Sequence, residues 1–220
     1  MLGFGDFTEE FVLKVFREVC GMSADDGITF EADKLRIERI REELEYGGLR
    51  LRTVANLPRA RINVVVDVGF GDAVEPGLEE IEFPVLLDSA APRLRAYPRE
   101  TVIAEKFQAM VHLGRANSRM KDFYDVWLLS KAYEFDEARL AKAIAATFER
   151  RRTEIPSELP DALTPEFARD ASKQRQWHAF VQELSTAPHS LETVVSDLAA
   201  FLMPMAEKAR GSTRTRQRAD

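Results

Sequence analysis

The chain has 220 residues, of which 45% are hydrophobic and 31% are charged, enough for one or two domains with a hydrophobic core. Its formal net charge of -6 argues against a general nucleic-acid coat protein, which would carry a basic excess. No apolar run is long enough to span a membrane, and no secretory signal pattern comes after Met1. These properties favour a cytoplasmic protein.

The cysteine and the histidines predict no metal site. Cys20 is the single cysteine and cannot form an internal disulfide, so a buried thiol in a reducing compartment is expected. His112, His178 and His189 have no ligand spacing with the cysteine or with each other, and no zinc site is therefore assigned.

The first part of the chain predicts one helix followed by strands. Apolar periodicity indicates a helix over residues 8–20. Alternating and β-branched residues then predict strands near 28–30, 34–41, 49–55 and 62–68, with a turn at Gly47-Gly48 and a shorter extended piece at 81–86.

Two of these strands carry charge on one face. Alternation places Arg50 and Arg52 on one face of their strand, and it places Arg61, Asn63, Val65 and Asp67 on one face of the next. If the strands pair, a mostly polar sheet face holds arginines near an aspartate. This face is either solvated or directed at nucleotide or RNA phosphates.

From residue 98 onward the pattern is helical, with further helices predicted at 136–151, 164–184 and 191–209. Three prolines between 156 and 165 indicate a linker before the last two helices, whose apolar residues predict a packed pair or, alternatively, a partner interface. The tail 210–220 is rich in Arg and Thr and is predicted to be disordered, as a solubilising or RNA-touching segment.

The best functional clue is a lysine and two aspartates on consecutive predicted helices. Lys106 lies beside an apolar stripe, so its stem should be packed and its ammonium should reach a rim or cleft. Asp122 and Asp125 are three residues apart near the start of the next helix, and they therefore lie on the same side of it. Asn117 or Ser118 is available as the cap of this helix. The two aspartates either stabilise the helix end or form a site.

Three segments together resemble the AbiEii/AbiGii-type abortive-infection toxin nucleotidyltransferases of the polymerase β-like superfamily. They are Glu105-Lys106, the run Lys121 to Asp125, and the strand around Asp67, and the resemblance covers residues 1 to about 152. It implies that Lys106 and Lys121 bind the nucleotide and that Asp122 and Asp67 are catalytic. It further implies that Asp67 helps to hold Mg²⁺, with Glu105 and Asp125 in support.

One departure from the resembled pattern stands out. The family's catalytic half opens with a Gly-Gly-Ser/Thr turn and an Asp-x-Asp metal-binding strand, and the sequence contains no Asp-x-Asp pair. The segment Met1 to Asp6 resembles the part of the family pattern that comes after that strand. The expectation is a shortened start, from a misassigned initiation codon or a degenerate gene, and an inactive chain.

The fold class expected is α+β: a partial polymerase β-like nucleotidyltransferase sheet with helices, followed by a helical C-terminal region. The expected divisions are 1–97 (nucleotidyltransferase region), 98–152 (motif-bearing helices), 153–209 (C-terminal helices) and 210–220 (tail). The resemblance implies a toxin of a toxin–antitoxin or phage-defence system that transfers nucleotides from NTP to RNA, such as tRNA, and has a cognate antitoxin. The alternative is a non-enzymatic, partner-binding pseudoenzyme.

Overall fold

The computed structural model describes residues 2–3, 8–24, 26–40, 48–70, 74–86, 88, 90–184 and 186–216, with side chains up to residue 211. The chain divides into two compact units, Met1–Asp72 and Ala73–Asp220, and each is described by itself. The division predicted after residue 97 therefore falls inside the second unit, and so does the one predicted after residue 152.

The first unit is a sheet with one helix. Strand β5 (Ala60–Phe70) pairs in parallel with β1 (Leu2–Gly3) and antiparallel with β4 (Gly48–Leu57), which also pairs with β2 (Thr29–Phe30) and β3 (Arg36–Ile40). Helix α1 (Glu9–Cys20) precedes the short helix η1 (Ala32–Lys34). The predicted helix and the four predicted strands are confirmed, with shifted ends. The predicted turn at Gly47-Gly48 lies partly outside the described residues.

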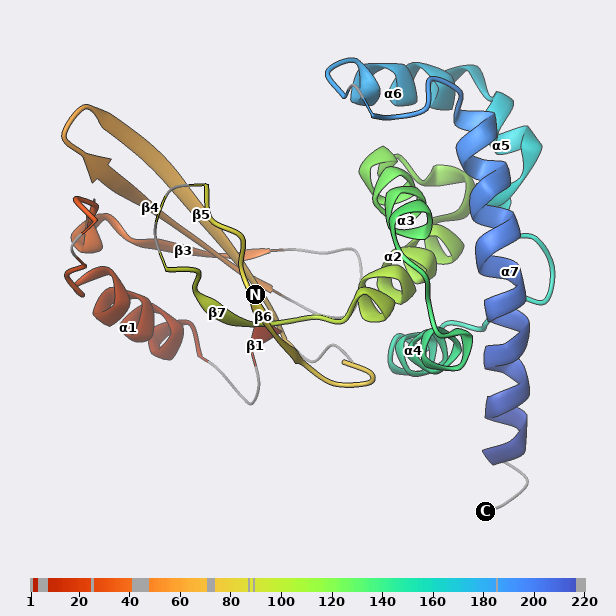
Figure 1. Ribbon diagram of the computed structural model, residues 1–220, viewed down its shortest axis with the longest axis horizontal. Helices are drawn as coiled ribbons and strands as arrows, with labels where there is room; N and C mark the ends of the chain where they lie inside the picture. The colour runs from red at the N-terminus through yellow and green to blue at the C-terminus, as the bar shows by residue number, and fades with distance from the viewer. Residues whose placement is uncertain are drawn as a thin grey trace. The chain divides into compact units, whose positions relative to one another are not determined.

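Local sequence explains these elements. The Thr8 hydroxyl accepts a hydrogen bond from the Phe11 amide and caps α1. The β4–β5 hairpin closes between the paired residues Leu57 and Ala60, at a turn that begins with a proline. Helix α1 lies along one face of the sheet (Figure 1) and packs a small core, formed by Val12, Leu35, Leu49, Leu51 and Val68. The opposite face of the sheet carries charged side chains, among them Arg50 and Asp67.

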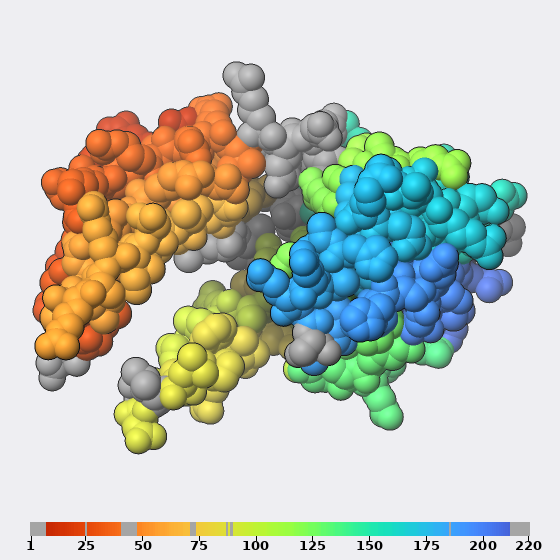
Figure 2. Space-filling view, turned by 90° about the horizontal axis from the view of Figure 1, so that it is seen from above, coloured from red at the N-terminus to blue at the C-terminus, as the bar shows by residue number. Residues whose placement is uncertain are grey.

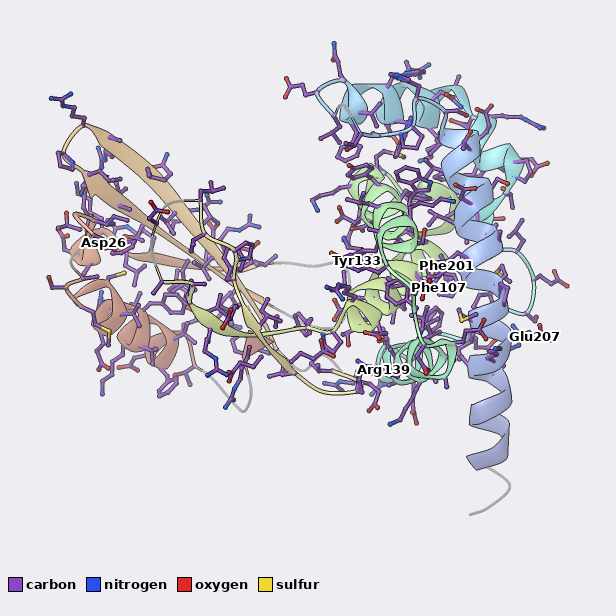
Figure 3. All side chains as sticks on the ribbon, viewed as in Figure 1. Asp26, Phe107, Tyr133, Arg139, Phe201 and Glu207 are labelled. Carbon is purple, nitrogen blue, oxygen red and sulfur yellow. The ribbon has the colours of Figure 1, made fainter. Side chains whose placement is uncertain are left out.

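The second unit is mainly helical. Its helices are α2 (Arg99–Leu113), α3 (Met120–Ala132), α4 (Glu137–Arg150), α5 (Pro165–Arg169), α6 (Ala171–Val181) and α7 (Leu191–Arg216), with short helices η2 (Gly114–Ala116) and η3 (Asp161–Leu163). In the space-filling view the α2–α7 helices form one continuous body (Figure 2). Phe107 lies inside it, fully buried with Phe123, Phe148, Phe167 and Trp177 (Figure 3).

A two-stranded ribbon, β6 (Glu79–Glu82) with β7 (Arg93–Ala96), belongs to the same unit. Arg139 of α4 connects it to the helices, because its guanidinium lies 2.8 Å from Glu79 Oε1 and 3.3 Å from Glu100 Oε1 (Figure 3). β6 overlaps the extended piece predicted at 81–86 only at residues 81 and 82, and β7 was not predicted.

Two predicted helices differ from the structure. The helix predicted over 164–184 is two helices, because Asp170 accepts hydrogen bonds from the Ser172 and Lys173 amides and starts α6 anew. Helix α7 continues to Arg216, past the predicted end at 209, so disorder is wrong for 210–216, and 217–220 lie outside the described residues. In the described part of the chain, no helix is long and apolar enough to cross a membrane.

Candidate functional site

Helices α2 and α3 bring four of the predicted site residues together. The Lys106 ammonium donates a hydrogen bond to Asp122 Oδ1 and lies 2.9 Å from Asp125 Oδ2. Lys121 Nζ lies 2.5 Å from the same Asp125 oxygen. The two lysines and two aspartates therefore form a charge-balanced cluster, in which Asp125 bridges both lysines. The predicted common side of Asp122 and Asp125 is confirmed.

Burial distinguishes the members of this cluster. The Lys106 side chain is 20% exposed and those of Asp122 and Asp125 are 15% and 22% exposed, whereas Lys121 is 70% exposed. Desolvation of the Lys106 ammonium acts to lower its pKa, but the hydrogen bonds to Asp122 and Asp125 outweigh it, and the pKa is raised. Lys106 therefore stays protonated at neutral pH, in a partly exposed setting that polar ligands can reach.

Unused hydrogen-bonding capacity remains in the cluster. An ammonium has three N–H donors, and the contacts of Lys106 within the described chain involve two aspartates. The hydrogen bond that Asp122 accepts from Lys106 is made by Oδ1, and no hydrogen bond of the second oxygen is seen in the described part of the chain. A ligand with an anionic oxygen and a hydroxyl could thus bind without displacing the existing contacts.

Glu105 points to a different group. Its Oε1 lies 3.7 Å from Arg151 Nη2, beyond the end of α4. Arg151 in turn donates a 3.0 Å hydrogen bond to the buried Gln108, whose amide donates to Thr153 Oγ1 at 2.7 Å. Glu105 belongs to this polar network between α2 and the α4 end, and it makes no described contact with Lys106 or Asp122.

The start of α3 differs from the prediction. Arg119 is the N-cap residue and makes no side-chain capping bond, so neither Asn117 nor Ser118 is the N-cap residue that was expected. Asn117 is fully buried, and its Oδ1 accepts a 2.8 Å hydrogen bond from the Arg119 amide. Asp122 is in the first turn of α3 and Asp125 is one turn further along the helix.

Asp67 lies in the other unit, on β5, directly opposite Arg50 of β4. Arg50 Nε and Nη2 each donate a 2.7 Å hydrogen bond, to Asp67 Oδ1 and Oδ2. These bonds hold the pKa of the Asp67 carboxyl below its usual value, against a smaller opposing effect of desolvation. The prediction of a polar sheet face with arginines near an aspartate is confirmed.

The magnesium ligand expected from the resemblance, Asp67, is already engaged by Arg50 in the structure. Both Asp67 oxygens are already hydrogen-bonded to Arg50, and no group of three or more His, Cys, Asp or Glu side chains in the described chain could hold a metal ion. A metal at Asp67 would have to displace the guanidinium.

A hollow of about 720 Å³ lies at the C-terminal end of α6. Its lining includes His178, Val181, Glu183, Leu184 and His189, and none of the predicted site residues. His178 and His189 have no ligand spacing in the sequence, and Val181 and Leu184 were expected in the packed pair of C-terminal helices, so the hollow adds no chemical preference.

The strand-bearing unit and the lysine–aspartate cluster on paired helices define the class: a mixed α+β protein consistent with a nucleotidyltransferase-like fold. Comparison with protein families is more specific. The family described as nucleotidyl transferase AbiEii toxin, Type IV TA system, matches residues 2–202, and the chain therefore belongs to the AbiEii toxin family. This family implies a toxin of a type IV toxin–antitoxin system with a cognate antitoxin. Searches of curated proteins and of solved structures find no match.

Proposed function

We propose that the protein is a type IV toxin of the cytoplasm that binds NTP and belongs to a system transferring nucleotides to RNA, with tRNA as the first acceptor to test. The observation that carries the proposal is the Lys106–Asp122–Asp125 cluster, a protonated lysine with a free donor beside a carboxylate with a free oxygen. Membership of a nucleotidyl transferase family supports the reaction class.

Each residue has a role in this proposal. The remaining Lys106 donor and the exposed Lys121 ammonium neutralise the triphosphate, because cations stabilise charge on transferring phosphoryl groups. Asp122 takes the proton of the attacking hydroxyl as the hydroxyl oxygen bonds to the α-phosphorus, and the bond between the α-phosphorus and the bridging oxygen breaks, so that pyrophosphate leaves with that oxygen. Asp125 holds both lysines, and Glu105 supports the α2–α4 junction.

Magnesium stays a prediction from the family and is supplied in the assay below. Asp67, as a catalytic and metal-binding residue, stays a prediction in the same sense. Since the sequence has no Asp-x-Asp pair and Asp67 is held by Arg50, we expect these 220 residues to bind NTP but to transfer nucleotides slowly or not at all.

The bidentate Arg50–Asp67 pair also favours a second candidate, a non-enzymatic protein that binds a partner. In that case the lysine–aspartate cluster stabilises the α2–α3 pair, and NTP is not a ligand.

The test combines two measurements on the purified chain. Binding of NTP is titrated for the wild type, Lys106→Gln and Arg175→Gln, the last removing an exposed cation from α6. Transfer is measured as RNA labelling from α-labelled NTP with Mg²⁺ and tRNA, for the wild type, Asp122→Asn and Asp125→Asn.

Binding that depends on Lys106 but not on Arg175 supports the proposed site. Labelling that Asp122→Asn abolishes supports the enzyme and refutes the expected inactivity, whereas binding without labelling supports inactivity. Labelling that is unchanged in Asp122→Asn places the chemistry elsewhere. Absence of both binding and labelling overturns the proposal in favour of the second candidate.

A further inference from the structure

A buried lysine lies next to the segment that leads into α3. Lys173 of α6 is only 8% exposed, and its ammonium donates a 2.7 Å hydrogen bond to the backbone carbonyl of Asn117. In the described part of the chain the ammonium has no ion pair, and the nearby Asp170 carboxylate is engaged by the backbone amides of Ser172 and Lys173. Burying an ammonium costs free energy unless its contacts compensate, and an apolar side chain of similar length would avoid this cost. The charge at this position therefore calls for an explanation.

The contacts of Lys173 reach both ends of the first turn of α3. Asn117, whose carbonyl binds the Lys173 ammonium, also accepts a hydrogen bond from the amide of Arg119, the N-cap residue just before the helix. The ammonium further lies 5.2 Å from the ring centroid of Phe167, which stacks on Phe123 at 5.4 Å. Asp122 lies between the two points that these contacts hold.

This first turn lacks the usual means of fixing its position. Its N-cap residue, Arg119, makes no side-chain capping hydrogen bond. Instead, the buried Asn117 before the helix and the stacking of Phe123 on Phe167 hold this turn in place. Lys173 contacts Asn117 directly and reaches the stack through the ring of Phe167.

We propose that Lys173 is a positioning residue, which sets the first turn of α3 and thereby the place of the Asp122 carboxylate beside Lys106. The NTP-binding arm of this inference rests on the proposed function, whereas its structural arm does not. Lys173 acts through Asn117 and Phe167 and touches no substrate.

The test is hydrogen–deuterium exchange on the full chain without ligand, followed by NTP titration. Lys173→Met keeps the length and loses the donor and charge, and we expect exchange of residues 119–123 to rise about tenfold with little change in α4. NTP affinity should fall by a similar factor. Arg175→Met, which removes an exposed charge from the same helix, is the matched control and should change neither.

Unchanged exchange at 119–123, or an equal rise over all helices, would overturn the inference, because the second result describes general destabilisation. If Lys173→Met does not fold, Lys173→Arg decides. Near-native protection at 119–123 in this variant supports the inference, and a uniform rise overturns it. A local rise in exchange without any NTP binding by the wild type would leave the positioning role intact and reject the proposed function alone.

Discussion

Lys106 shows how one residue can be both a stabilising contact and a candidate ligand group. Its ammonium is shared by two carboxylates that are themselves mostly buried. Removing the ammonium leaves the two negative charges of Asp122 and Asp125 close together in a mostly buried site. A Lys106 variant should therefore lose folding stability as well as NTP affinity. A variant at this position therefore needs both readouts.

The raised pKa of Lys106 predicts how stability depends on pH. The group keeps its proton in the folded state above the ordinary lysine pKa of 10.5, where the unfolded chain releases it. Its contribution is therefore complete below about 10.5 and is lost as pH rises toward the folded-state pKa. Urea midpoints from pH 9 to 11.5 should fall more steeply for the wild type than for Lys106→Met. Parallel curves for the two proteins would contradict this.

Lys106 and Lys121 should differ in their effect on NTP binding. Lys106→Gln removes a preorganised charge and should weaken binding by about 1.5–3 kcal/mol, the usual value of a hydrogen bond to a charged group. Lys121→Gln should cost less than about 1 kcal/mol, because its side chain is 70% exposed and mobile cations at the surface contribute little. Titration of both variants with a fluorescent NTP measures the difference. Equal losses of binding free energy would show that burial does not determine how much each lysine contributes to NTP binding.

At the residue scale, helical spacing predicted that Asp122 and Asp125 share a side of α3, whereas Lys106 of α2 was assigned to the same site by the family resemblance. The sequence did not predict that Glu105 joins Arg151 instead, because that contact depends on where α4 ends. It also gave no sign of Lys173, since a lysine in the first turn of a helix ordinarily faces solvent. Contacts between segments distant in the chain were the part that sequence left open.

Among the elements, alternation and periodicity predicted every described strand of five residues or more and the main helices. The strand β7 was missed because its four residues, Arg93 to Ala96, offer one large apolar side chain. The break between α5 and α6 was missed because apolar residues continue on both sides of Asp170. The Asp170 side chain accepts hydrogen bonds from the Ser172 and Lys173 amides and so begins a new helix. Short elements and caps depend on few residues, so pattern alone describes them poorly.

The β4–β5 pair supports a prediction at the element scale. The lowered pKa of Asp67, caused first by its hydrogen bonds with Arg50, gives stability that is present above the ordinary pKa of 3.8 and is lost as pH falls below it. Because the pair is partly exposed, Asp67→Asn should cost no more than about 1 kcal/mol at pH 7. It should also flatten the loss of stability between pH 4 and 2 in urea unfolding followed by circular dichroism. Asp33→Asn, on the exposed η1 helix, is the matched control and should leave the acid profile unchanged.

On the scale of the whole molecule, the two units have very different cores. In its described residues, the first unit has a cluster of five buried apolar side chains between α1 and the sheet, with a few partly buried neighbours. The second has a continuous core that joins α2, α3, α4, α5, α6 and α7, including four fully buried phenylalanines and Trp177. Since burial of apolar area is the main favourable term in folding, the second unit should be the more stable. The division of the chain at residues 72 and 73 results from these cores, and no linker composition marked it in the sequence.

Residues 73–220 should consequently fold without the first unit. Both tryptophans, Trp127 and Trp177, lie in this segment, and their indole groups donate to Asp197 and to the Pro188 carbonyl. Tryptophan fluorescence therefore reports unfolding of the second unit even in the full chain. We expect the isolated segment to unfold cooperatively in urea, with a fluorescence-detected unfolding free energy within about 1 kcal/mol of that in the full chain. Circular dichroism of the full chain should show an earlier, smaller transition from the first unit. An unfolded segment, or a fluorescence midpoint far below that of the full chain, would show that the helical unit depends on the strand-bearing one for its stability.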